Sequence, residues 1–366
     1  MNSIKYEKIY SKTSLRIFLE RNKGEVYVKN SMKKLSFLLF GLVLLLAACG
    51  GGNETSTEST EGNTGTETEG TSEEKTFNIG ITQIVEHPSL DAATEGFKAA
   101  LEESGLNVKF VDKNAQNDQS MNTTIAQDLV NQGVDLIFAN STPSAQAVKG
   151  ATSDIPIIFT SVTDAVGAEL VDSMEAPGGN VTGTVDLHPD TIANTVAFLK
   201  DELGAKKVGT VYNTGEQNSV AQVEQVKALL EEAGIELVES AVSTSAEVKQ
   251  ATESLIGKVD SLYIITDNTV VSALESVIDV ANANQLPLMV GELDSVKRGG
   301  LGAYGFEYYD IGYEAGQMAV KILKGEATPS EIPAAYPANL KLLINKSAAE
   351  NLGLEIKDTW NAEVYE

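Results

Sequence analysis

Cysteine and histidine are almost absent from this sequence. Its 366 residues include one cysteine and two histidines. A single cysteine excludes an intramolecular disulfide framework and any zinc or iron–sulfur site built from several cysteines. Two histidines leave too little material for a histidine-based metal centre. We therefore expect no metal and no cofactor.

Basic residues are also scarce. Lys and Arg number 27 against 52 Asp and Glu, which gives a formal net charge of −25. Binding to DNA or RNA requires a basic face, so we expect no nucleic-acid partner. The first 48 residues hold seven Lys, two Arg and three Glu, a net charge of +6, so the remaining residues carry −31.

No apolar run is long enough to span a membrane as a helix. The run from Leu35 to Leu46 has roughly twelve residues, against the ~20 that a spanning helix needs. It follows Lys33-Lys34 and precedes Ala47-Ala48, an arrangement typical of a secretory signal peptide. An uncleaved anchor is the alternative interpretation.

The only cysteine, Cys49, directly follows this small-residue pair. The segment resembles the bacterial lipobox, which implies a diacylglyceryl thioether on Cys49 at the start of the mature chain. Residues 1–48 are then a leader and 49–75 a flexible acidic tether. Residues 1–31 fit no part of this plan, and we hypothesise that translation starts at Met32 or near it. We expect the body to lie at the outer face of the cell membrane, anchored by lipid, in a Gram-positive bacterium.

From residue 77 onward, short apolar strands alternate with amphipathic helices. Strands are predicted over 77–81, 108–111, 134–138, 155–159, 207–212, 235–242, 261–265 and 286–290, and helices over 91–103, 121–129, 144–150, 220–230, 247–257 and 270–283. This alternation predicts an α/β fold with parallel sheets covered on both faces. It falls into two runs of domain size, at about 77–182 and 190–292, so we expect two three-layer lobes with a ligand cleft between them.

Polar residues follow most of these strands, where a cleft between two parallel sheets would lie. We predict that they bind a ligand. The candidates are Gln83, Glu86, Ser141, Thr142, Ser161, Thr163, Asp164, Asn213, Glu216, Asn218, Ser219, Asp267, Asn268, Thr269 and Glu292. Each could instead cap the helix that follows it. Ser141 and Thr142 precede a helix with Pro143 in its first turn, and a helix N-terminus can hold a carboxylate.

Nucleotide-binding and hydrolase motifs are missing from the sequence. It has no G-x-x-x-x-G-K-[ST], no G-x-S-x-G and no G-x-G-x-x-G. Both histidines, His87 and His188, precede a proline and are expected in turns. We therefore expect no catalytic residues and no enzyme.

Four loop motifs carry a resemblance to a known family. Residues 86–91 read EHPSLD, 161–168 SVTDAVGA, 177–183 PGGNVTG and 212–219 YNTGEQNS. They resemble the ABC-transporter substrate-binding lipoproteins of the tryptophan/tyrosine type, over essentially residues 77–355. The family usually has Pro where this chain has Ala165.

The resemblance implies a type I periplasmic-binding-protein-like fold with three crossover strands. Lobe 1 would comprise 76–185 plus about 303–330, and lobe 2 186–302 plus about 331–366, with 341–345 as the last strand. The resemblance also implies a monomer that closes on a small molecule and delivers it to an ABC permease with its ATPase subunits. A ligand sensor or surface-interaction lipoprotein is the alternative.

An aromatic amino acid is the ligand that the resemblance suggests first. Ser141 and Thr142, together with Ser161, would bind its α-carboxylate, and Asp267 or Glu292 its α-ammonium group. The sequence identifies no apolar slot, because the only tryptophan, Trp360, lies near the end of the chain. Another amino acid or a related metabolite stays open as the ligand.

Overall fold

The computed structural model describes residues 75–366, so the leader, Cys49 and all but the last residue of the tether lie outside the described residues. The described residues fall in one compact unit and form two sheets. No helix among them is both long enough and apolar enough to cross a membrane.

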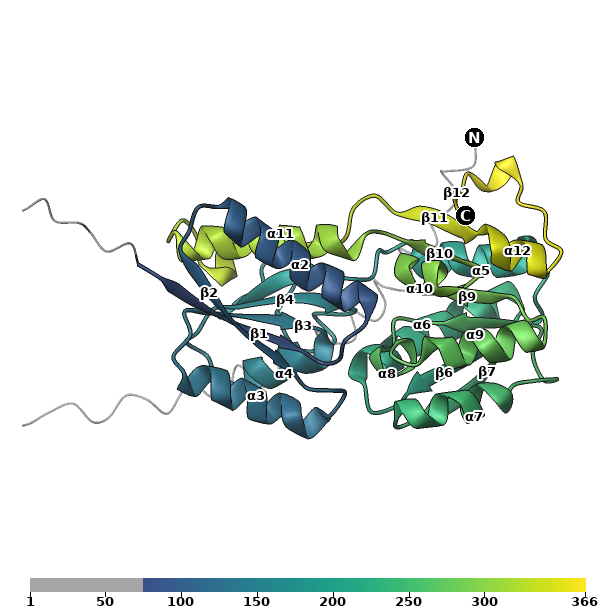
Figure 1. Ribbon diagram of the computed structural model, residues 1–366, viewed down its shortest axis with the longest axis horizontal. Helices are drawn as coiled ribbons and strands as arrows, with labels where there is room; N and C mark the ends of the chain where they lie inside the picture. The colour runs from purple at the N-terminus through teal and green to yellow at the C-terminus, as the bar shows by residue number, and fades with distance from the viewer. Residues whose placement is uncertain (1–74) are drawn as a thin grey trace, which may run out of the picture. The chain divides into compact units, whose positions relative to one another are not determined.

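The first lobe contains a parallel five-stranded sheet with strand order β2-β1-β3-β4-β5. Its elements are β1 (Phe77–Gln83), α2 (Pro88–Glu103), β2 (Val108–Asn114), α3 (Gln119–Asn131), β3 (Leu136–Asn140), α4 (Thr142–Ala151), β4 (Ile157–Val162) and β5 (Val181–Val185). Buried side chains of α3 and α4 cover one face of this sheet, and those of α2 and α11 (Tyr308–Leu323) cover the other. Figure 1 shows α2 and α11 side by side.

The second lobe contains a seven-stranded sheet with strand order β12-β11-β10-β9-β8-β6-β7. Its elements up to the return are α5 (Thr191–Asp201), β6 (Lys207–Asn213), α6 (Gln217–Ala233), β7 (Glu236–Val242), η1 (Ser245–Glu247), α7 (Val248–Glu253), β8 (Ser261–Ile264), α8 (Asn268–Val271), α9 (Leu274–Ala283), β9 (Leu288–Val290), α10 (Leu293–Arg298) and β10 (Gly302–Gly305). The chain then enters α11 in the first lobe, passes η2 (Pro329–Glu331), and returns through β11 (Lys341–Asn345), α12 (Lys346–Asn351), η3 (Asp358–Trp360) and β12 (Glu363–Tyr365).

Two apolar layers cover this second sheet. Buried residues of α5, α6 and α12 pack on one face, and those of α7, α9 and α10 on the other. The predicted α/β fold with two three-layer lobes is confirmed. One detail differs, because β11 runs antiparallel to β10 and the second sheet is therefore mixed.

The glycines of α2 and α11 explain how the returning helix reaches the first lobe. A Cβ atom on Gly96 would collide with the Tyr309 carbonyl, and one on Gly312 with the Ala93 carbonyl. The two backbones therefore approach more closely than larger residues would permit. This contact fixes α11 against α2, although α11 follows a strand of the other lobe.

The structure corrects both limits of the returning segment. Residues 303–305 belong to β10, which pairs with β9 and β11 in the second sheet rather than with the first lobe. At the other end, Ala335 forms a β-bridge with Thr184 of β5, so residues 331–335 lie with the first lobe. The last strand of the second lobe is β12, not 341–345, and β12 has only three residues. The helix expected over 270–283 is divided into α8 and α9.

Candidate ligand-binding site

Two serines at the carboxyl ends of adjacent strands have strained backbones. Ser141, between β3 and α4, has φ of 108°, and Ser161, near the end of β4, has φ of 54°. Both side chains are buried. A residue other than glycine with positive φ costs of order 1–3 kcal/mol, and such residues concentrate at ligand-binding sites. The strained serines therefore mark a candidate site at the carboxyl ends of β3 and β4, which we call the first rim.

The same rim holds two buried hydroxyl groups that have no hydrogen-bond partner among the described residues. They are Thr142 Oγ1, in the first turn of α4, and Ser161 Oγ. The neighbouring Ser141 Oγ caps α4 by accepting a hydrogen bond from the Ser144 amide at 3.4 Å. A buried hydroxyl left without a partner costs about 1–3 kcal/mol, which a polar ligand would recover. Together with the positive end of the ten-residue helix α4, these groups suit a carboxylate.

A buried carboxylate lies close to this rim, on the first crossover between the lobes. Asp186 follows β5, and its Oδ1 accepts a hydrogen bond from Thr163 Oγ1 at 3.3 Å. Its Oδ2 accepts one from the hydroxyl of Tyr308 at 2.8 Å. Burial raises the pKa of Asp186 to about 6 and that of Tyr308 well above its ordinary value. The sequence analysis missed Asp186 because it assigned no strand over 181–185.

In the second lobe, Glu216 is the centre of a buried hydrogen-bond network. Its Oε1 accepts hydrogen bonds from the Thr269 amide at 3.1 Å and the Thr269 hydroxyl at 2.7 Å. Its Oε2 accepts hydrogen bonds from the side-chain amide of Asn268 at 2.6 Å and that of Asn218 at 3.5 Å. Glu216 therefore joins the start of α6 to the start of α8.

Asp267 performs the capping role that the sequence left open as its alternative. Its Oδ1 accepts a hydrogen bond from the Val270 amide at 2.8 Å, and its Oδ2 one from the Asn213 amide at 2.6 Å. Burial and the neighbouring Glu216 raise the pKa of Asp267 to about 7. Both carboxylate oxygens thus accept hydrogen bonds from backbone N–H groups that the fold holds in place, which shows the capping role. Binding of a ligand ammonium group by Asp267 stays a prediction.

Glu292, the other acid expected to bind an ammonium group, is also buried. It accepts a hydrogen bond from Ser295 Oγ at 2.7 Å, and burial raises its pKa to about 7. The hydroxyl of Ser89, in the first lobe, shares in its hydrogen bonding and also donates to Asp294 Oδ2 at 3.1 Å. Glu292 therefore lies where the start of α10 meets the start of α2.

Other side chains form hydrogen bonds between the first lobe and the facing residues of the second lobe. We call these facing residues, Glu216 and 267–269, the second rim. The amide of Asn117, after β2, donates to Thr269 Oγ1 at 3.0 Å, and Asn213 donates to the same hydroxyl at 2.9 Å. His87 caps α2 and forms a side-chain hydrogen bond with Asn268. Burial lowers the pKa of His87 to about 3, so its imidazole is neutral at physiological pH. His87 and Asn117 were not among the predicted site residues.

Most of the remaining predicted residues make hydrogen bonds within their own lobes, and of these Ser219 contacts Asp267. Gln83 forms hydrogen bonds with Asp91 and Thr94 inside the first lobe. A pocket of about 320 Å³ is lined by these residues and by the exposed Glu86. Asp164 accepts a hydrogen bond from the Gly167 amide at 2.8 Å and so closes its own turn. Ser219 is buried in α6 next to Asn218.

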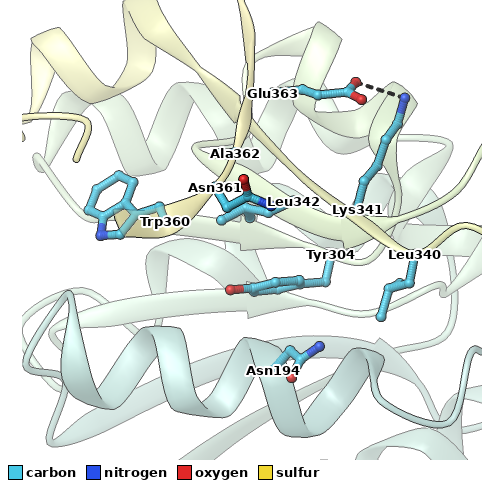
Figure 2. Close-up of a pocket in the computed structure, with 9 residues that line it drawn as sticks. All are labelled: Asn194, Tyr304, Leu340, Lys341, Leu342, Trp360, Asn361, Ala362 and Glu363. Atoms are coloured by element: carbon cyan, nitrogen blue, oxygen red, sulfur yellow. Dashed lines mark ion pairs between the residues drawn. The ribbon is translucent and has the colours of Figure 1, made fainter. Parts of the chain in front are cut away.

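A larger pocket of about 460 Å³ lies on the second lobe, where Figure 2 shows nine lining residues. They come from α5, β10, β11, the segment before β11 and the C-terminal segment, and include Tyr304, Trp360 and the ion pair Lys341–Glu363. None of the predicted ligand-binding residues lines this pocket. We therefore place the candidate site at the facing strand ends instead.

Comparison with known proteins shows the family to which this chain belongs. Residues 78–365 match the family model of the ABC transporter substrate-binding proteins. The chain belongs to this family. A tyrosine-binding protein of Clostridioides difficile is 42% identical over 332 residues, which are 89% of this chain and 93% of that protein. The family resemblance inferred from the loop motifs is therefore confirmed, and this family is a solute-binding one.

Two solved relatives of this substrate-binding family differ in their state. A domain from Streptococcus pneumoniae in complex with L-Trp is 34% identical over 79% of this chain and 99% of that chain, with a TM-score of 0.75. A ligand-free, open substrate-binding protein with adhesive properties from Clostridium difficile is 41% identical over 79% of this chain and 99% of that chain, but its TM-score is 0.60. The relative with lower identity is the better structural match. Together with the hydrogen bonds between the rims, this indicates that the described residues adopt an arrangement nearer to the liganded relative.

Proposed function

We propose that this chain binds a free aromatic amino acid, tyrosine or tryptophan, in the cleft between its lobes and delivers it to the permease of an ABC importer. The observation that carries the proposal is the pair of unpartnered buried hydroxyls, Thr142 Oγ1 and Ser161 Oγ, beside the start of α4. A tyrosine-binding relative at 42% identity and an L-Trp complex at 34% identity support an aromatic amino acid as the ligand.

The ligand would act by joining the two rims. A ligand shifts the equilibrium between open and closed lobes only by as much as its affinity for the closed form exceeds that for the open form. Polar side chains of both lobes already meet between Asn117 and Thr269 and between Ser89 and Asp294. A ligand carboxylate on the first rim and contacts to the second would add to these interactions and favour closure.

We also propose that the chain is an exported lipoprotein at the outer face of the cell membrane, attached through Cys49, with permease and ATPase subunits as partners. The leader and the lipobox-like segment support this location. Replacement of Cys49 by Ser is expected to abolish lipid labelling without changing ligand affinity. Continued labelling of the Cys49→Ser variant contradicts the lipid assignment.

A second function, surface interaction, is favoured by one specific observation. The ligand-free relative from Clostridium difficile is described as having adhesive properties. The two functions are separated by measuring uptake of labelled tyrosine or tryptophan in cells with and without this chain. Loss of uptake supports the transport function, whereas unchanged uptake with reduced adhesion of the cells supports surface interaction.

Calorimetric titration of the full chain tests the binding proposal. We expect saturable 1:1 binding of L-tyrosine or L-tryptophan, weaker binding of aliphatic amino acids, and no binding of the D-enantiomers. A ligand at 100 times its dissociation constant should raise the free energy of unfolding by about 2.7 kcal/mol. Absence of binding by all common L-amino acids contradicts the proposal.

A further inference from the structure

We propose that Asp186, held between Thr163 and Tyr308, is the residue that binds the α-ammonium group of the amino-acid ligand. The inference rests on the proposed function and identifies a binding residue that the loop motifs did not indicate. Asp186 is buried on the first crossover, between β5 and α5. It therefore lies on a segment that belongs to both lobes.

The hydrogen-bond partners of the buried carboxylates distinguish Asp186 from Asp267 and Glu216. Asp267 accepts hydrogen bonds from two backbone amides, and Glu216 accepts backbone and side-chain donors from the start of α8. Backbone amides in helix starts cannot turn away to admit a ligand. Asp186 accepts hydrogen bonds from two side-chain hydroxyls, at 2.8 Å and 3.3 Å. Hydroxyl groups can rotate away from the carboxylate, so both oxygens of Asp186 can turn to an ammonium donor.

Covalent geometry of the ligand distinguishes Asp186 from Glu292. The amino nitrogen and the carboxylate carbon of an amino acid are bonded to the same Cα atom and lie about 2.5 Å apart. The group that binds the ammonium must therefore be next to the groups that bind the carboxylate. Asp186 is hydrogen-bonded to Thr163, two residues after Ser161 with its unpartnered hydroxyl. Glu292 also lies near Tyr308, but its own hydrogen-bond partners are Ser295 and Ser89, at the starts of α10 and α2.

Tyr308 gives this position an aromatic neighbour. Its hydroxyl is hydrogen-bonded to Asp186, and its ring stacks on Phe306 with centroids 5.5 Å apart. Both rings are buried, Phe306 on the second crossover between β10 and α11 and Tyr308 at the first residue of α11. The pair brings apolar surface to a charged binding position, which suits an aromatic amino acid. We assign Tyr308 as a positioning residue for the Asp186 carboxylate.

The test compares L-tyrosine with 3-(4-hydroxyphenyl)propionate, which has the same carboxylate and ring but no ammonium group. Calorimetry uses the full chain at pH 8, where Asp186 is ionised. The wild-type chain should bind L-tyrosine at least about 30-fold more tightly than the des-amino analogue. In Asp186→Asn this preference should fall to less than about threefold, while the affinity for the analogue stays within threefold of the wild-type value.

Matched variants test whether another acid performs this role. Asp267→Asn and Glu292→Gln should keep the preference for L-tyrosine within threefold of the wild-type ratio. Asp186→Glu keeps the negative charge but moves it by one methylene group, so it should reduce the preference for L-tyrosine over the des-amino analogue at least tenfold. This variant replaces Asp186→Asn in the test if Asp186→Asn does not fold. An unchanged preference in Asp186→Asn or Asp186→Glu, or its loss in Glu292→Gln alone, overturns the inference. If the wild-type chain binds no amino acid, the proposed function itself fails.

Discussion

The two rims that face each other in this protein use similar residues in different ways. On the first lobe, Thr142 and Ser161 have buried hydroxyls without partners, and the backbones of Ser141 and Ser161 are strained. On the second lobe, Glu216 and Asp267 are buried and their carboxylates accept several hydrogen bonds each. Thr142 and Ser161 still lack a partner among the described residues, whereas the carboxylates of Glu216 and Asp267 have theirs, although Asn218 Oδ1 beside Glu216 also lacks one. Partner count, not polarity, is therefore the criterion by which we propose binding residues on the first rim.

The largest expected effect is the loss of stability when the second rim loses its central carboxylate. Glu216→Ala leaves the amide and hydroxyl donors of Asn268 and Thr269 buried without an acceptor. We expect the free energy of unfolding to fall by about 3–5 kcal/mol, because several buried donors lose their acceptor at a cost of about 1–3 kcal/mol each. Glu224→Ala, an exposed change on the same helix, should alter it by less than about 0.5 kcal/mol. Denaturant titration of both variants measures the difference, and equal values contradict the structural role of Glu216.

Two buried threonines test the contrast by partner count alone. Thr142 Oγ1 has no partner among the described residues, whereas Thr182 Oγ1 donates to the Ile332 carbonyl at 2.7 Å. Thr182→Val should lower the free energy of unfolding by about 1–3 kcal/mol and leave affinity unchanged. Thr142→Val should raise the free energy of unfolding, because it removes a buried hydroxyl without a partner, but weaken binding of L-tyrosine by about 0.5–1.5 kcal/mol. A reversed pattern in unfolding and calorimetry data shows that Thr142 is only structural.

The pH dependence of stability tests the buried acid Glu292. Its pKa is raised to about 7 in the folded chain, against an ordinary value near 4.5, so the folded state takes up a proton more readily than the unfolded state. The free energy of unfolding should therefore rise as pH falls, and between pH 8 and 6.5 Glu292 contributes on the order of 1 kcal/mol of this rise. Glu292→Gln should reduce the slope over that interval. An identical slope in both proteins shows that Glu292 does not titrate there.

The smallest expected change has opposite signs for stability and for binding. Ser161→Gly removes the strain of positive φ and an unpartnered hydroxyl, so the free energy of unfolding should rise by about 0.5–1 kcal/mol. The affinity for L-tyrosine should fall about 2- to 10-fold, because the hydroxyl is lost. Ser153→Gly, at an exposed position, should slightly lower stability and leave affinity unchanged. A stability loss in Ser161→Gly means that the serine is not held in a strained state for binding.

Most of the fold could be predicted from the sequence, because buried parallel strands and amphipathic helices leave strong periodic signals. The β5 strand was missed, since its sequence VTGTV has little apolar character and follows a glycine-rich loop. The three-residue strand β12 is exposed and leaves no pattern at all. The sequence does not show to which lobe β10 belongs, because β10 pairs with β11, and β11 comes only after α11 in the chain.

The candidate site was predicted less completely than the fold. Position at a strand end identified Ser141, Thr142 and Ser161, because that signal is local. It could not distinguish these residues from Asp267, since a helix cap and a ligand-binding acid have the same local sequence. Asp186 and Tyr308 lie 122 positions apart in the chain and meet only through the crossovers. No local pattern indicates such a pair.

A crystal structure of the chain with bound L-tyrosine would test the central contrast between the rims most directly. The account predicts the ligand carboxylate at the start of α4, within hydrogen-bond distance of Thr142 Oγ1 or Ser161 Oγ, and the ammonium group on Asp186. It also predicts that Glu216 and Asp267 keep their hydrogen bonds to Thr269 and Val270. A ligand ammonium group bound to Glu216 or Asp267, with Thr142 and Ser161 still without partners, would contradict the account.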